Sequence, residues 1–373
     1  MQRAKFPAAR LAGGLLVALL LVALLLGLAE AGLRIAGRLG TGAWPRTRTA
    51  AFYDQVLLLR RLCRDHAFLN TSPREGITVT VFGRSAAVNR FGYRSPERPL
   101  TKPPGTLRVL ASGGSTTFDT LAPDNAAAWP SRLEERLRAG GRPVEVWNAG
   151  FPGWTSQESL ISLVIRDLDL SPDVALFYHA VNDLQPASHA PFDPQYEAGH
   201  AAISRRALGL DLPPPSWLDR LLVVEKLREL GSGPINPWHA LTAPPGSTRR
   251  DQIGEAGIAT FERNARSFAA LARSRGTGVL LITQPLRIRQ AARAADLEHL
   301  SGWYPELNPE AAPREIERLN DVLRKLAGEG VADLADAARE IAWTDEDFGD
   351  PIHYTEKGRA KLVDFLAPRI EAE

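Results

Sequence analysis

The sequence has little cysteine, the residue that forms disulfides and many structural zinc sites. It holds a single cysteine, Cys63, in 373 residues, which excludes a disulfide within the chain. No cluster of cysteine and histidine has the ligand spacing of a structural zinc site. Structural zinc is therefore not expected, and we expect no metal site and no cofactor.

The sequence also lacks an excess of either charge. Its 45 basic and 43 acidic residues give a formal net charge of +2, and they are scattered rather than gathered in a basic stripe. We expect no nucleic-acid partner. An apolar content of 44% in a chain of this length is enough for one large domain, alone or with an appendage.

One long apolar run stands near the N-terminus. After a basic N-terminus at 1–10, with Arg3, Lys5 and Arg10, residues 11–29 form an uninterrupted stretch of 19 small and apolar residues. A helix needs roughly 20 such residues to cross a bilayer. Ala29-Glu30-Ala31 fits a signal-peptidase site, so a cleaved signal peptide is the alternative. The length favours a retained transmembrane signal anchor, which predicts a single-pass membrane protein with its catalytic domain periplasmic or extracellular.

The remainder divides at about residue 107. Residues 30–106 are interpreted as a juxtamembrane and β-rich segment, irregular from 40 onward, with a strand at 77–83 and a proline-rich linker at 89–105. In 107–373, short apolar runs alternate with amphipathic stretches, which predicts an α/β domain with a parallel sheet and helices on both faces. The expected strands are 107–111, 144–149, 173–180 and 278–285, and the expected helices 127–139, 156–168, 252–275, 313–327 and 356–366.

An insertion at 184–250 interrupts this alternation. It is rich in proline and glycine, but residues 217–230, WLDRLLVVEKLREL, are typical of one amphipathic helix. Such a helix packs on the domain, covers the site as a lid or faces the membrane. Because the insertion follows the third strand, we expect it to overhang the carboxyl edge of the sheet and to influence substrate choice.

Candidate site residues follow the predicted strands, at the edge where ligands bind in such sheets. Ser115 in VLASGGSTTFDT follows the first strand, Gly150 the second and Asn182 the third. Asp350 and His353 stand three residues apart near the C-terminus. Each has an ordinary alternative as a turn former or helix cap. Their common edge and order favour a catalytic site.

These residues resemble the four sequence blocks of the SGNH, or GDSL-type, hydrolase superfamily, from about residue 107 to the C-terminus. The resemblance places Ser115 on the nucleophile, Gly150 on the block-two glycine, Asn182 on the block-three asparagine, and Asp350 and His353 on the D-x-x-H pair. It implies a three-layer sandwich with a central parallel sheet, flavodoxin-like, after the N-terminal transmembrane helix.

Two positions depart from the superfamily pattern. Gly114 stands where the GDS motif has aspartate, and Ala180 stands where the G-x-N-D motif has glycine. Neither change removes a chemical group from the implied mechanism. An α/β-hydrolase is disfavoured because the stretch lacks the second glycine of G-x-S-x-G, and a P-loop because no Gly-Lys-Ser/Thr follows.

The resemblance implies a serine esterase. His353 would take the proton of the Ser115 hydroxyl, and Asp350 would orient the ring. The backbone N–H groups of Ser115 and Gly150 and the amide of Asn182 would form the oxyanion hole. The expected substrate is an acyl ester, such as an acetyl ester, of an envelope glycan or lipid.

Two other functions stay open from the sequence. An O-acyltransferase would use the same residues with a sugar hydroxyl in place of water, and an inactive module would only bind a glycan or a partner. Asp183 is expected to support its turn outside the site, and His179 is the next candidate for the base.

Overall fold

The computed structural model describes residues 8–42, 44–81, 84–196, 205, 211, 216–232, 248–287 and 294–371. The chain forms two compact units. The first comprises Met1–Asp54 with Pro213–Pro237, and the second Gln55–Leu212 with Trp238–Glu373. Most of 197–215 and all of 233–247 lie outside the described residues. The expected overhang of 184–250 above the sheet edge depends largely on those segments.

The first unit contains α1 (Ala8–Thr41), which continues well past the apolar run. Glu30 and Arg34 form an i, i+4 ion pair at 2.7 Å in this continuation, a spacing that stabilises helices. The part Gly13–Thr41 is long and apolar enough to cross a membrane, and its most apolar window is not buried. The predicted membrane-spanning segment therefore coincides with a helix of suitable length.

The amphipathic segment of the first unit is broken, so the prediction of one helix over 217–230 is wrong. It forms a 3-10 helix, η2 (Trp217–Arg220), and an α-helix, α8 (Leu222–Ser232). Leu221 between them has an extended backbone, with φ −93° and ψ 119°. Ser216 and Asp219 form a capping box around η2, which stabilises a separate start ahead of α8.

The second unit is built on a five-stranded parallel sheet in the order β6-β5-β7-β8-β9. The strands are β5 (Leu107–Gly113), β6 (Val144–Asn148), β7 (Val174–Tyr178), β8 (Gly278–Ile282) and β9 (Asp333–Ala335). Four of them were predicted. The fifth, β9, has three residues, too few for a periodic signal. β5, β6 and β7 are buried along their whole length, as expected for strands covered on both faces.

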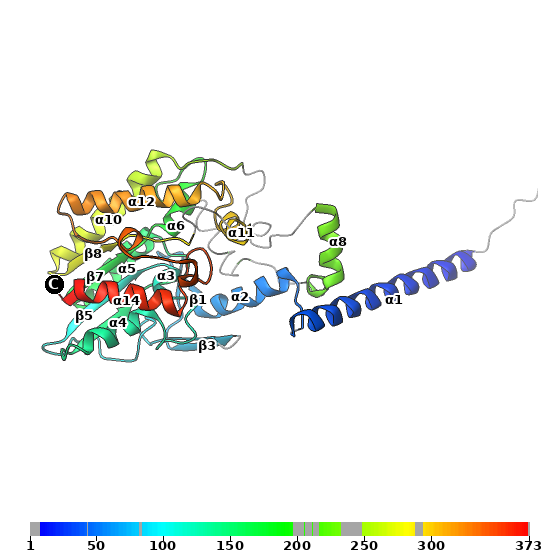
Figure 1. Cartoon of the computed structure of the whole chain (residues 1–373), viewed down its shortest axis with the longest axis horizontal. Helices are drawn as coiled ribbons and strands as arrows, with labels where there is room; N and C mark the ends of the chain where they lie inside the picture. The colour runs from blue at the N-terminus through cyan, green and yellow to red at the C-terminus, as the bar shows by residue number, and fades with distance from the viewer. Residues whose placement is uncertain are drawn as a thin grey trace, which may run out of the picture. The chain divides into compact units, whose positions relative to one another are not determined.

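Helices cover both faces of the sheet, which confirms the predicted three-layer α/β fold (Figure 1). Alternate strand residues pack into separate cores. Val109 and Leu176 join the core of α4 (Trp129–Arg138) and α14 (Glu356–Glu371). Leu110 and Phe177 join the opposite core, which contains residues of α5 (Ser156–Ile165), α10 (Glu255–Ser274) and α12 (Ala312–Gly328).

The stretch before β5 is more regular than predicted. Residues expected to be irregular contain α2 (Arg48–Leu62), whose alanines, leucines and arginines favour helix. Two antiparallel hairpins follow, and the expected strand at 77–83 is β3. They are β1 (Cys63–Asp65) with β2 (Thr71–Pro73), and β3 (Ile77–Val81) with β4 (Arg84–Val88). The short helices of the second unit are α3 (Ser115–Phe118), η1 (Asp167–Leu170), α6 (Val181–Ala187), α11 (Ala294–Trp303), α13 (Ala337–Glu340) and η3 (Asp345–Asp347).

The strand order determines where the sheet has its switch point. β6 lies on one side of β5, and β7 lies on the other. The connections that follow β5 and β7 leave in opposite directions, and in such sheets ligands bind beyond the carboxyl ends of the strands at this switch point. The residues after β5 and β7 are those around Ser115 and Asn182, so both groups stand at this switch point.

Candidate active site

Ser115 is the first residue of α3, directly after the carboxyl end of β5. The chain turns there through two glycines. A Cβ at Gly113 would lie 2.6 Å from the carbonyl oxygen of Tyr178 and would overlap Thr117, so only glycine fits. Backbone N–H groups in the first turn of a helix have no partner within the helix, so the N–H of Ser115 points out of α3. Ser115 itself is half-buried, between residues that are fully buried.

Asp350 and His353 occupy one tight loop between η3 and α14. The N–H of Gly349 donates to the carbonyl of His353 at 2.8 Å, and an antiparallel bridge joins Phe348 to Tyr354. One oxygen of Asp350 accepts the backbone N–H groups of Ile352 at 2.9 Å and His353 at 2.8 Å. This is the usual behaviour of aspartate in a turn. The loop therefore holds the carboxylate and the imidazole against each other.

The three predicted catalytic residues lie in one hydrogen-bonded row. Nε2 of His353 is 2.8 Å from Oγ of Ser115, and Nδ1 is 2.7 Å from Oδ2 of Asp350. Ser115 and His353 are separated by 238 positions in the chain. Such a row can move a proton from a hydroxyl to an imidazole while a carboxylate stabilises the resulting cation.

Electrostatics in this row favour the charged pair. Burial of the His353 ring disfavours its protonated form, but the Asp350 carboxylate outweighs burial, so the pKa of His353 is raised above its usual value. Burial also opposes ionisation of Asp350, yet His353 and the backbone donor of Ile352 hold the pKa of this carboxyl well below its usual range. Asp350 is therefore ionised at neutral pH.

Gly150 and Asn182 lie beside this row, each with a hydrogen bond of its own. The backbone N–H of Gly150 donates to Oδ1 of Asn148 at 3.0 Å. Nδ2 of Asn182 donates one of its two hydrogens to the carbonyl of Trp154 at 2.7 Å. A Cβ at Gly150 would approach Cβ of Thr117 to 2.7 Å, so glycine is needed for close packing against α3.

The glycine that departs from the GDS motif has a steric explanation. A Cβ at Gly114 would overlap Nδ2 of Asn182 and lie 3.1 Å from the carbonyl oxygen of Trp154. In this structure the space of a side chain at 114 is filled by the Asn182 amide. Asn182 therefore sits directly against the residue that precedes Ser115.

A buried ion pair, which the sequence did not reveal, supports the helix of Ser115. Asp119 ends α3 with a left-handed backbone, φ 64°. Its carboxylate accepts Nε of Arg359 at 2.7 Å and the backbone N–H of Trp129 at 2.9 Å. Both charged side chains are almost fully buried. Arg359 belongs to α14, which follows the His353 loop, so this pair ties the two halves of the row together.

Arg287 supports the His353 loop from the side of β8. Its backbone N–H donates to the carbonyl of Pro351 at 3.0 Å, and its Nη1 donates to the carbonyl of Phe348 at 3.3 Å. Asp296 on α11 accepts Nε of the same guanidinium at 3.0 Å. Arg287 therefore holds this loop on both sides of Asp350.

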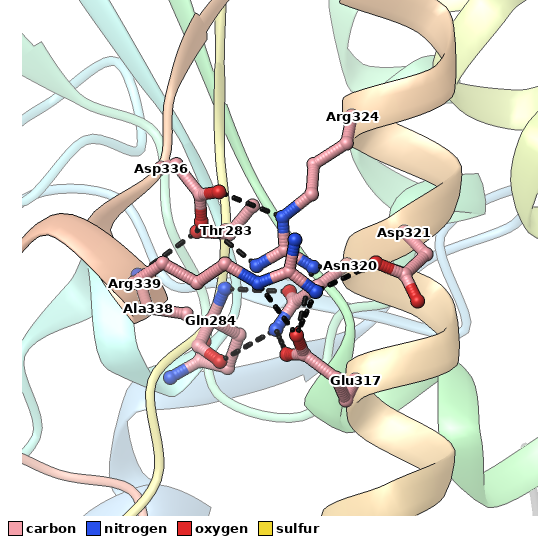
Figure 2. A network of polar contacts seen from close by, with 9 residues as sticks. All are labelled: Thr283, Gln284, Glu317, Asn320, Asp321, Arg324, Asp336, Ala338 and Arg339. Atoms are coloured by element: carbon pink, nitrogen blue, oxygen red, sulfur yellow. Dashed lines mark hydrogen bonds and ion pairs between the residues drawn. The ribbon is translucent and has the colours of Figure 1, made fainter.

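A polar network fixes the chain between β8 and Arg287 (Figure 2). The Asn320 amide accepts the N–H of Gln284 at 2.8 Å and donates to its carbonyl at 3.0 Å. Arg324 donates to both oxygens of Asp336, at 2.7 and 2.8 Å, and Thr283 donates to the same carboxylate at 2.7 Å. The network joins the ends of β8 and β9 to α12, so the segment leading to Arg287 starts from a rigid position.

Burial lowers the pKa of two further histidines, His179 and His299. His299 on α11 interacts electrostatically with Asp350 and His353, and burial lowers its pKa. The sequence contains no motif that would have identified it. His179 is buried with Nε2 2.9 Å from Oγ of Ser159, and burial lowers its pKa to about 3. Asp183 accepts the backbone N–H of Ser156, the first residue of α5, at 3.1 Å.

Comparison with solved structures gives matches of low similarity. A GDSL-like lipase from Bacteroides thetaiotaomicron VPI-5482 is 16% identical, with 71% of this chain and 88% of that chain covered and a TM-score of 0.39. The lipase/acylhydrolase from Enterococcus faecalis is 18% identical, with 71% and 96% covered and a TM-score of 0.40. A variant of an acetyl-xylooligosaccharide esterase from Geobacillus Stearmophilus is 14% identical, with 72% and 95% covered and a TM-score of 0.42.

Comparison at the level of sequence is more decisive. No curated protein matches the chain. The profile of the GDSL-like lipase/acylhydrolase family, however, matches residues 111–361, which include Ser115, Asn182 and the Asp350–His353 loop. The chain belongs to the GDSL-like lipase/acylhydrolase family and is a serine hydrolase that acts on ester bonds.

Proposed function

We propose that Ser115, His353 and Asp350 are the catalytic triad of a membrane-anchored esterase. The observation that carries this proposal is the unbroken row from Asp350 through His353 to Ser115, with contacts of 2.7 and 2.8 Å. Both distances lie within the reach that proton transfer requires.

In the proposed mechanism, Oγ of Ser115 attacks the acyl carbon while Nε2 of His353 takes its proton. The tetrahedral intermediate collapses, His353 protonates the leaving alcohol, and the acyl group stays on Ser115. Water then attacks the acyl-enzyme by the same route in reverse, which releases the acid and restores the serine. Asp350 stabilises the imidazolium in both halves.

We assign three hydrogen-bond donors to the oxyanion. Two of them are the backbone N–H of Ser115 and the second amide hydrogen of Asn182. The N–H of Gly150 is a third donor, and it must exchange its bond to Asn148 for one to the oxyanion. Neutral donors of this kind, held in place before reaction, stabilise charge that develops only in the transition state.

The proposed substrate is an acyl ester of an envelope glycan or lipid. The support for this is α1, which is apolar and long enough to tether the enzyme to a membrane. A tethered hydrolase meets esters of the membrane and of the surrounding envelope. We accordingly place the catalytic unit on the periplasmic or extracellular side.

The test is a burst experiment on the full chain with an activated acetyl ester. Steady release of acetate in water, abolished in Ser115→Ala, supports the esterase. A stoichiometric burst that turns over only when an oligosaccharide is added indicates a transferase with the same triad. No acylation by the folded wild-type protein contradicts catalysis at Ser115.

A further inference from the structure

The segment formed by η2 and α8 exposes apolar side chains on the first unit. Trp217 is 71% exposed, Leu227 55% and Leu230 85%. Leu227 and Leu230 are three positions apart, which places them on the same side of α8. Large exposed apolar patches mark interaction sites, whereas single exposed apolar residues are ordinary.

Hydrogen bonds attach this segment to one level of α1. The carboxylate of Glu30 accepts the N–H of Val223 at 2.8 Å, and Arg34 donates to the carbonyl of Arg220 at 2.9 Å. Thr47, just after α1, donates to the carbonyl of Asp219 at 2.5 Å. The segment is therefore docked on the polar part of α1 through its own backbone.

The part of α1 that binds this segment, around Glu30 and Arg34, begins where the apolar run ends. Residues 11–29 carry no charge, and Glu30 follows immediately. At about 1.5 Å per residue, 19 helical residues cover roughly 29 Å, close to the hydrocarbon thickness of a bilayer. If α1 spans the bilayer, Glu30 stands at its boundary. Within the first unit, α8 runs across α1 rather than along it (Figure 1), so it would then lie in the plane of the membrane.

We propose that η2 and α8 form an interfacial segment that inserts Trp217, Leu227 and Leu230 into the headgroup region beside the α1 span. Tryptophan favours this region because its ring is apolar and its N–H is polar. The segment would fix the rotation and depth of α1 in the bilayer. The inference requires α1 to remain as a span and is independent of the proposed esterase activity.

The ligand is the apolar boundary of a bilayer rather than its charge. Lys226 pairs with Glu229 at 2.6 Å, and Arg228 pairs with Asp219 at 2.9 Å. Their charges are thus largely neutralised within the segment. We therefore expect insertion into vesicles of zwitterionic phosphatidylcholine, with no requirement for anionic lipid.

The test uses the full chain with single cysteines that carry an environment-sensitive fluorophore. The only native cysteine is Cys63, which is buried, so Cys63→Ala provides the background. Labels are placed at Leu227→Cys and Leu230→Cys, with Leu20→Cys as the deep control in α1. Arg228→Cys is the matched control on α8, about 100° around the helix from Leu227.

In phosphatidylcholine vesicles, brominated lipid should quench the labels at 227 and 230 several-fold more than the label at 228. A soluble quencher should show the opposite order. Adding anionic lipid should leave the order unchanged. If the soluble quencher acts equally on labels at 227, 228 and 230 while the label at 20 lies deep in the bilayer, the interfacial role is overturned. Labels at 227 and 230 that are shielded from both quenchers would also overturn it, because they indicate a contact with protein. An aqueous label at 20 would overturn the span and the proposal with it.

Discussion

A side chain at position 114 should disturb the site through Asn182. In Gly114→Ala the new carbon would lie well within 3.0 Å of Nδ2 of Asn182, whereas ordinary contact begins at 3.4 Å. The amide must therefore move by about 1 Å, and a misplacement of about 1 Å at a reacting centre can cost about 10²-fold in rate. Overpacking of a dense interior costs about 1–3 kcal/mol in the free energy of unfolding.

The assay measures kcat on an acetyl ester and the urea midpoint on the same preparation. Gly328→Ala is the matched control, because a Cβ there meets nothing within 4 Å. Gly114→Asp restores the aspartate of the GDS motif, yet it should be at least as harmful as alanine.

A double-mutant cycle isolates the collision. In the Asn182→Ala background the space beside Gly114 is open, so Gly114→Ala should destabilise the protein much less than it does alone. Equal costs in both backgrounds, or a Gly114→Ala protein with normal kcat and midpoint, would refute the steric reasoning.

The remaining predictions concern the charged pairs. Activity should rise with pH through an ionisation above about 6.5, because the raised pKa of His353 must be exceeded before its neutral ring can accept a proton. Asp350→Asn should shift this rising limb of the kcat profile to lower pH. An unshifted limb would contradict the assignment. Because the pKa of His353 is raised on folding, protonated His353 stabilises the folded protein fully below about pH 6.5, and this stabilisation is lost as pH rises through the folded-state pKa. Urea midpoints of wild type and Asp350→Asn, measured across this pH window, should show the loss in the wild type. Arg359→Met should lower the free energy of unfolding by about 3–5 kcal/mol, because it leaves Asp119 buried without its cation. Arg369→Met on the same helix removes an exposed pair with Glu340 and should cost about 1 kcal/mol or less; similar losses in both variants would count against the role of burial.

The parallel sheet could be predicted because its strands are buried on both faces. The runs at 107–111 and 173–180 are apolar nearly throughout, and buried parallel strands show this pattern. Elements defined by contacts with the rest of the chain could not be predicted. β9 is three residues long and depends on its pairing with β8. Thr47 and Glu30 bind the segment on the two sides of the break at Leu221, and these contacts have no signal in the sequence.

The row of Ser115, His353 and Asp350 could be proposed from the sequence because these residues resemble the blocks of the GDSL-type pattern, although Ser115 and His353 are 238 positions apart. Asp350 and His353 belong to one loop, and Ser115 follows a strand end that periodicity identifies. The structure places these residues together, and their catalytic role stays a proposal. The bond of Gly150 to Asn148 could not be foreseen, since a glycine N–H carries no signal of its partner.

The residues that support the row escaped prediction because their partners are distant in sequence. Asp119 and Arg359 are 240 positions apart, and each alone resembles an ordinary surface charge. The same reasoning applies to Gly114, which in the sequence is only a missing aspartate. In the structure, Gly114 and Asn182 compete for one volume, so the residue at one position limits what the other can be. A departure from the motif at 114 is therefore interpretable only together with the position of the amide at 182, and a larger residue at 114 requires Asn182 to take another position.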